Sequence, residues 1–112
     1  MAATPILEAP AGVAVTTAGV TVYTNASVDR RKIVRVAFVN IDGVNDAALS
    51  YCRFVDAAPS GSFGILPVNS KVAKLDGLFV TKTLDPGDSI TAAASVNGDI
   101  EATVEIIGSE AV

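Results

Sequence analysis

Two carboxylates and a side-chain amide lie close together between Asp42 and Asp46, where the chain reads Asp-Gly-Val-Asn-Asp. Oxygen ligands of this kind bind Ca²⁺, but the stretch lacks the alternating acidic spacing and the bidentate glutamate of a calcium-binding loop. Asp, Gly and Asn are also the residues that favour a tight turn. We therefore predict a turn here, with Gly43 as a structural residue, and no metal site.

Cys52 is the only cysteine, and the chain has no histidine. A nucleophilic cysteine or serine needs a base, so the absence of histidine removes the Cys-His and Ser-His-Asp arrangements, and most zinc sites with them. Cys52 lies in an apolar segment, where a free cysteine behaves as a small hydrophobic residue. We predict that it fills space in the core.

The chain also lacks the residues that other kinds of catalytic or binding site need. A glycosidase needs two carboxylates across a cleft, but most acidic residues here fall in predicted turns. The stretch Gly61–Gly64 lacks the lysine and the following helix of a phosphate-binding loop. With no tryptophan and only two tyrosines, a sugar-stacking face is not expected. We predict that the protein is not an enzyme and takes no cofactor. The acidic residues in turns are Asp42, Asp46, Asp85, Asp88 and Asp99.

The composition favours burial against partners. The chain has 112 residues, which fits one domain, and 50% of them are hydrophobic while only 18% are charged. Such a surface is expected to pack against other proteins or other copies of the chain, although an Ala-rich core would also explain the composition. No apolar run approaches the roughly 20 residues of a membrane helix. We expect no membrane partner.

The charge distribution argues against nucleic acid as a partner. The formal net charge is −4, whereas a nucleic-acid binder carries a stripe of Lys and Arg. The largest basic group, Arg30-Arg31-Lys32, follows Asp29 and is interpreted as a solvated start of a strand.

The first 18 residues differ from the remainder of the chain. They are rich in Ala, Thr, Pro and Val, and Pro5 and Pro10 oppose a helix. We divide the chain into residues 1–18, an N-terminal arm or first strand, and residues 19–112, a single β-sandwich domain. The N-terminus lacks the charges and apolar core of an export signal, so we expect synthesis in a cytoplasm.

Residue alternation predicts strands along the chain. In Lys32–Ile41, Val34, Val36 and Phe38 share one face, while Ile33, Ala37, Val39 and Ile41 share the other with Arg35 among them. Apolar residues on both faces predict a central strand that is covered on both sides or that faces a subunit. The other predicted strands are Val20–Thr24, Ala47–Val55, Gly64–Lys71, Leu78–Thr83, Ser89–Val96 and Ile100–Ile107.

In Ala47–Val55, Leu49, Tyr51 and Val55 are expected on one face, and Ser50, Cys52 and Phe54 on the other. Turn residues separate the last strands. Pro86, Gly87 and Asp88 belong to an Asp-Pro-Gly-Asp turn, and Asn97-Gly98 is the preferred pair of a two-residue hairpin. The C-terminal third is therefore predicted to be a β-meander.

With seven to eight short strands and no sustained helical period, the chain is predicted to be all-β. The expected fold is an antiparallel β-sandwich of jelly-roll or immunoglobulin-like kind.

Several short motifs lie on these strands and turns. They are Val22–Thr24 (Val-Tyr-Thr), Lys32–Val36 (Lys-Ile-Val-Arg-Val), Asn40–Asp42, Leu75–Val80 (Leu-Asp-Gly-Leu-Phe-Val) and Leu84–Ile90. In this order they resemble the small virion proteins of tailed bacteriophages, over residues 20 to 107. That family usually has Pro-Ala-Gly in the loop where this chain has Asn25-Ala26-Ser27.

The resemblance implies a structural part of a virus particle, made in the host cytoplasm. The most specific expectation is a capsid decoration (cement) protein that forms a homo-oligomer, with a trimer as the expected stoichiometry, and binds the major capsid protein or other virion proteins. A tail, head–tail connector or baseplate protein is the near alternative, and a non-viral β-sandwich adhesion or binding module is the second. Candidate interface residues are Ile6, Leu7, Val13, Val15, Arg35 and Phe63.

Overall fold

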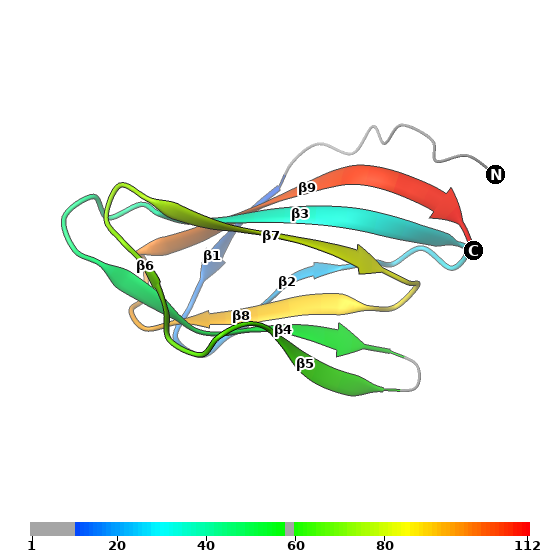
Figure 1. Cartoon of the computed structure of the whole chain (residues 1–112), viewed down its shortest axis with the longest axis horizontal. Helices are drawn as coiled ribbons and strands as arrows, with labels where there is room; N and C mark the ends of the chain where they lie inside the picture. The colour runs from blue at the N-terminus through cyan, green and yellow to red at the C-terminus, as the bar shows by residue number, and fades with distance from the viewer. Residues whose placement is uncertain (1–10, 58–59) are drawn as a thin grey trace.

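The computed structural model describes residues 11–57 and 60–112, and these residues form nine strands and no helix. The strands lie in two layers (Figure 1). Their bounds are β1 Ala11–Val15, β2 Val20–Thr24, β3 Arg30–Asn40, β4 Ala47–Asp56, β5 Gly61–Leu66, β6 Ser70–Val72, β7 Gly77–Leu84, β8 Ser89–Ala94 and β9 Ile100–Ala111.

One sheet has the strand order β1-β9-β3-β7, and the other has the order β2-β8-β4-β5, with β6 also paired to β4. Every strand pair is antiparallel. The predicted all-β antiparallel class is thus confirmed, in a β-sandwich-like arrangement of two sheets.

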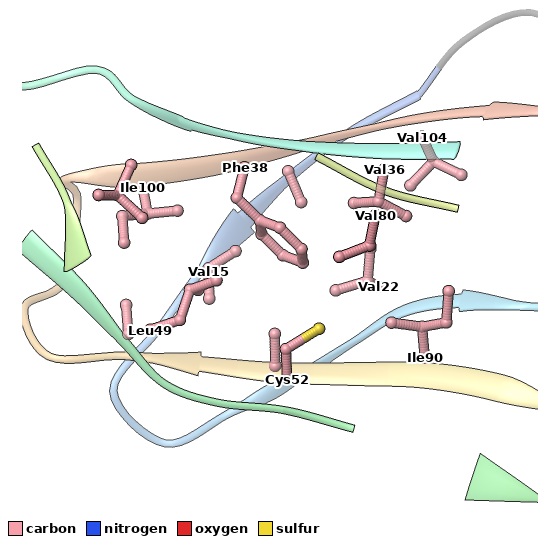
Figure 2. Packing of buried hydrophobic residues seen from close by; sticks show 14 of the residues in the cluster. Val15, Val22, Val36, Phe38, Leu49, Cys52, Val80, Ile90, Ile100 and Val104 are labelled. Carbon is pink, nitrogen blue, oxygen red and sulfur yellow. The ribbon is translucent and has the colours of Figure 1, made fainter. Parts of the chain in front are cut away.

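The core lies between the sheets and follows from residue alternation. On β3, Val34, Val36 and Phe38 are completely buried. Phe38 points toward Leu49 and Cys52 of the opposite sheet (Figure 2). Each fully buried side chain of the size of Val, Leu or Phe contributes roughly 1.5 to 3 kcal/mol to folding. The predicted inward face of this strand is confirmed.

The other face of β3 is not covered by another layer of the described chain. Arg35 is exposed, Ala37 is half-buried and Val39 is 37% exposed. Of the two possibilities in the sequence, a strand covered on both sides within one chain is therefore wrong. The alternative, a face directed at a partner, stays a prediction.

The region predicted as one strand at Gly64–Lys71 forms parts of two strands, β5 and β6. Pro67 lies in the interruption, and Asn69 has a positive φ of 59°. Pro lacks a donor for a strand ladder, and a left-handed residue ends the extended conformation. The described residues consequently contain nine strands where seven to eight were predicted.

The predicted C-terminal β-meander is wrong. β8 lies in the sheet opposite β7 and β9, and its partners are β2 and β4. Asn97-Gly98 therefore does not close a hairpin but belongs to a five-residue connection, 95–99, between the sheets. Turn residues reverse the chain, whereas the burial of the strand faces selects the pairing partner.

The predicted faces of β4 are wrong because of a β-bulge. The register with β8 shifts between Leu49 and Tyr51, so one extra residue enters β4 and side-chain parity changes. Leu49 and Cys52, predicted on opposite faces, are both buried in the core. Tyr51, predicted to share the face of Leu49, is instead half-buried.

Candidate binding face

The outer surface of the β1-β9-β3-β7 sheet carries an open depression of about 190 Å³. Its floor is Ala37, which pairs with Phe79 of β7 on one side and Thr103 of β9 on the other. Arg35 and Glu105, directly paired in neighbouring strands, complete the lining. The small side chain of Ala37 between larger neighbours creates the hollow.

An apolar strip runs from this depression to one end of the sheet. We define it by Val39, Ile41, Leu75 and Phe79, which are 37%, 55%, 85% and 61% exposed. Val39 pairs with Gly77 and Ala37 with Phe79, so Val39 and Phe79 are diagonal neighbours on one face. Ile41 follows two residues after Val39, just beyond the end of β3.

Leu75 joins the strip through the β6–β7 loop, which lies beside the end of β3. The backbone amide of Asn40 donates a hydrogen bond to the backbone carbonyl of Asp76 (3.1 Å). The loops after β3, β6 and β8 gather at this end of the molecule, on the left in Figure 1. The strip therefore continues from the sheet surface onto the loops.

The backbone of Leu75 is in the left-handed region, with φ of +64°. This conformation costs roughly 1 to 2 kcal/mol for an L-residue other than Gly. The loop is fixed by the amide of Asp76, which donates to the Ala73 carbonyl, and by Gly77, whose amide donates to the Asp76 carboxylate. The strained loop holds a large apolar side chain in solvent.

Charged groups border the apolar strip. The Arg35 guanidinium lies over the Phe79 ring, 5.2 Å from its centroid, in the geometry of a cation–π contact. Glu105 is exposed on the neighbouring strand. The face thus offers an aromatic ring, aliphatic side chains, one cation and one carboxylate.

The carboxylates of the Asp42–Asp46 turn are engaged within the chain. Asp42 Oδ2 accepts hydrogen bonds from the backbone amide and the side-chain amide of Asn45. Asp46 accepts from the Lys74 amide and pairs with Lys71 at 3.0 Å. The Lys74 hydrogen bond, followed by the Lys71 hydrogen bond, lowers the pKa of Asp46. In the described ranges, no group of three or more potential His, Cys, Asp or Glu ligands could hold a metal ion.

Cys52 is 1% exposed and lies in the core. Burial raises the pKa of its thiol from 9.0 to about 11. A thiol in this state is a poor nucleophile, because the thiolate is the reactive form. The prediction that Cys52 fills space in the core is confirmed.

The predicted turn glycines have the expected backbone. Gly43, Gly87 and Gly98 have φ of +78°, +87° and +86°. Pro86 occupies the turn between β7 and β8. Asp88, the last residue of the same turn, is 4% exposed and accepts hydrogen bonds from the backbone amides of Asp85 and Ala57.

Asn97 Oδ1 accepts a hydrogen bond from the Thr17 amide. Gly19 also has a positive φ, of 94°, and was not singled out in the sequence. The turn that contains Asn97 therefore contacts the β1–β2 connection instead of closing a hairpin.

The basic group at the start of β3 contacts other parts of the chain. Arg31 pairs with Asp85 at 2.6 Å and with Glu110 at 3.2 Å. Arg30 Nε donates to the Ser109 hydroxyl at 2.6 Å, and Lys32 Nζ lies 6.0 Å from the centre of the Tyr23 ring. β3 begins at Arg30, so these residues do start a strand, and the Arg31 side chain is 39% exposed. Their contacts also join β3 to its neighbours.

The predicted interface residues do not form one surface. Val15 is completely buried in the core, because β1 pairs with β9 and its alternate residues face inward. A partner could not reach Val15, so its assignment to an interface is wrong. Val13 is half-buried, and Arg35 lies on the binding face. Phe63 is 57% exposed on β5 and stacks on Phe54. Ile6 and Leu7 lie outside the described residues.

None of the four residues of the strip is among the interface residues predicted from the sequence. Phe79 could have been found, because it alternates with Leu78 and Val80 in a strand whose other face is apolar. Ile41 was placed on the outer face of its strand but not assigned to an interface. Leu75 gave no signal, since leucine rarely adopts a left-handed backbone.

Comparisons of the chain with protein-family models, with curated proteins and with solved structures found no match. Across the part of the chain that the structure describes, no helix has the length and apolarity needed to cross a membrane.

Proposed function

We propose that this chain is a structural virion protein of a tailed bacteriophage, in the first place a capsid decoration protein that stabilises the head by binding neighbouring capsomers. The proposal rests on the sequence resemblance along Leu75–Val80 and Leu84–Ile90. The single observation that carries the binding role is the exposed apolar strip, with Val39 and Phe79 on the outer face of the β1-β9-β3-β7 sheet and Ile41 and Leu75 in the adjoining loops. A contiguous exposed apolar surface is characteristic of a protein contact.

We also infer that the two sheets form a jelly roll and not an immunoglobulin-like sandwich. The supporting feature is the strand order, β1-β9-β3-β7 against β2-β8-β4-β5. Along the chain, only β4, β5 and β6 follow one another within a sheet, and the other successive strands change sheets. Two interlocked Greek keys produce this alternation.

Copies of the protein are proposed to associate, with a trimer as the expected form, and to be carried in the virion after synthesis in the host cytoplasm. A trimer matches the local threefold positions of an icosahedral shell. Several weak contacts then act together, so attachment to the shell is strong even when each contact is modest. The partner is the major capsid protein or another protein of the particle.

We do not propose the N-terminal residues 1–18 as the segment that anchors the protein to the shell. Residues 11–15 form β1, and Val15 belongs to the core. Removing residues 2–18 would therefore delete an edge strand and a core side chain, and the sandwich is not expected to remain intact. The proposed contact surface is the apolar strip.

Binding of purified protein to heads that lack it tests this surface. Leu75→Ser and Phe79→Ser change exposed side chains, so folding should be nearly unaffected. Val28→Ser is the matched control, because Val28 is 89% exposed in the β2–β3 loop, away from the strip. If the strip is the anchor, each strip variant should lose about tenfold or more in affinity, and Val28→Ser should bind as the wild type. Strip variants with wild-type occupancy would exclude this surface.

A further inference from the structure

β7 is the edge strand of its sheet and, with eight residues, the longest of the edge strands. It pairs with β3 on one side, and no other strand of the described chain pairs with its free side. A free edge presents unpaired N–H and C=O groups, which are a template for pairing with another strand.

Lys82 occupies an inward position of this edge strand. Alternate residues of β7 face the core, and Val80 and Leu84 are 8% and 0% exposed. Lys82 lies between them in the same row and pairs with the buried Val34. A charged residue thus interrupts an otherwise apolar row.

The Lys82 side chain spans the gap between the sheets at their open side. Its Nζ lies 4.5 Å from the centre of the Phe54 ring, on β4 of the opposite sheet. Phe54 in turn stacks on Phe63 of β5, the edge strand of that sheet, with 6.3 Å between the ring centres. Lys82 therefore lies on the flank bounded by the edge strands β7 and β5.

This position makes pairing at the β7 edge unfavourable. A lysine ammonium keeps its hydration when its stem is buried, and removing a charge from water costs several kcal/mol. A strand added to β7 would cover the flank where Lys82 reaches solvent. If the added strand were β7 of a second copy, two ammonium groups would also approach each other.

We propose that β7 is a latent pairing surface for β7 of a second copy, and that Lys82 keeps this surface closed in the free protein. Antiparallel pairing of identical strands is two-fold symmetric, so one segment supplies both partners. The outward residues Phe79, Thr81 and Thr83 are aromatic or β-branched, the types that favour strand pairing. This inference is independent of the proposed virion role.

Light scattering after size-exclusion chromatography, over a range of concentrations, tests the proposal. Lys82→Met removes the charge at similar length, Lys82→Arg keeps it, and Lys74→Met makes the same chemical change in the β6–β7 loop. Lys82→Met should associate at least tenfold more tightly than the wild type, with twice its mass at high concentration. Lys82→Arg and Lys74→Met should match the wild type.

A cross-link locates the contact. Thr81→Cys in the Lys82→Met background should form an intermolecular disulfide under mild oxidation, and Thr81→Cys alone should not. Equal masses for Lys82→Met and wild type, or association of Lys74→Met to the same degree, would overturn the proposal. If Lys82→Met fails to fold, Lys82→Gln takes its place and must associate more than Lys82→Arg. Because every comparison is made with the wild type, the result does not depend on the oligomer proposed above.

Discussion

The backbone amide of Asn25 donates a hydrogen bond to the carbonyl of Asp88, with 2.9 Å between nitrogen and oxygen, and both side chains are buried. The Asn25 side chain donates to the carbonyls of Arg30 and Leu84, each at 2.9 Å. The Asp88 carboxylate accepts from the amides of Asp85 and Ala57. These two residues therefore join the loops after β2, β4 and β7.

Replacing Asn25 by alanine should destabilise the protein by roughly 2 to 4 kcal/mol, because the buried carbonyl of Leu84 and the part-buried carbonyl of Arg30 lose their donor. Urea unfolding measures the change. Asn97→Ala is the matched control, since its side chain makes one exposed hydrogen bond, to Thr17, and a loss below about 1 kcal/mol is expected. Equal effects of the two substitutions would contradict the joining role of Asn25.

Asn40 has the corresponding role at the other end of β3. Its side-chain amide donates to the carbonyls of Asn45 and Val72, at 2.8 and 3.0 Å. We expect Asn40→Ala to cost about as much as Asn25→Ala, and the two effects to add within about 0.5 kcal/mol because the sites share no partner. Strong non-additivity in the double variant would contradict this.

Gly87→Ala and Gly98→Ala should differ in their effects, although both glycines have a positive φ. A Cβ on Gly98 would meet nothing within 4 Å, so only the backbone strain of about 1 kcal/mol applies. A Cβ on Gly87 would lie 3.0 Å from the Ala57 Cβ, which adds a steric cost.

Thermal unfolding should therefore show a lower Tm for Gly87→Ala than for Gly98→Ala. Ala57→Gly removes the atom that a Cβ on Gly87 would meet. In the double variant Ala57→Gly, Gly87→Ala, corrected for the effect of Ala57→Gly alone, the loss of Tm should therefore fall to that of Gly98→Ala. The backbone strain remains. A Tm for Gly98→Ala that equals that of the wild type would show that Gly98 does not have the left-handed backbone conformation.

Gly19 combines a positive φ of 94° with a close neighbour. A Cβ at this position would overlap the Tyr51 hydroxyl. Gly19→Ala should thus destabilise the protein more than Gly98→Ala, and Tyr51→Phe should restore part of the loss. A double-mutant cycle in urea measures this coupling; a coupling of zero would mean that the two residues do not meet.

Cys52 gives a pH-dependent prediction. Its pKa is raised by burial from 9.0 to about 11 in the folded protein, so the unfolded state releases its proton first as the pH rises. The stabilising effect of the neutral thiol is full below pH 9, and is lost as the pH rises from 9 toward 11. Between those values, the free energy of unfolding should fall more for the wild type than for Cys52→Ala.

The same burial should protect Cys52 from a thiol reagent. At pH 8 the folded protein should react with a disulfide reagent far more slowly than the protein unfolded in urea. Rapid labelling of the folded protein would contradict the buried position.

The sequence was sufficient for features that depend on local chemistry. The turn at Asp85–Asp88 and the positive φ of Gly87 follow from residues that favour a turn whatever surrounds it. The partner of β8 could not be predicted, because pairing is decided by which faces of distant strands are buried together. The predicted faces of β4 are wrong for a related reason. The β-bulge at Ser50 reverses which face the following side chains occupy, and no distinctive sequence marks such a bulge.

Only some residues of the candidate site could be predicted from the sequence. Arg35, predicted as an interface residue, is exposed on the candidate face, and its interface role stays a prediction. The alternation around Phe79 indicates an outward aromatic side chain. Val15 was misassigned because an arm and an edge strand share the same composition. Leu75 could not be identified, since its exposure depends on a strained loop that the positions of Asn40 and Asp76 define.

The central proposal, a structural role in the particle of a tailed bacteriophage, is tested most directly by quantitative mass spectrometry, which counts the copies of the protein in purified particles of the phage proposed to encode it. A decoration protein should be present in numbers comparable to the capsid protein subunits, and a particle reconstruction should place the strip of Val39, Ile41, Leu75 and Phe79 against the shell. A copy number that fits a single small ring would move the protein to the connector or tail. Absence from purified particles would contradict the account.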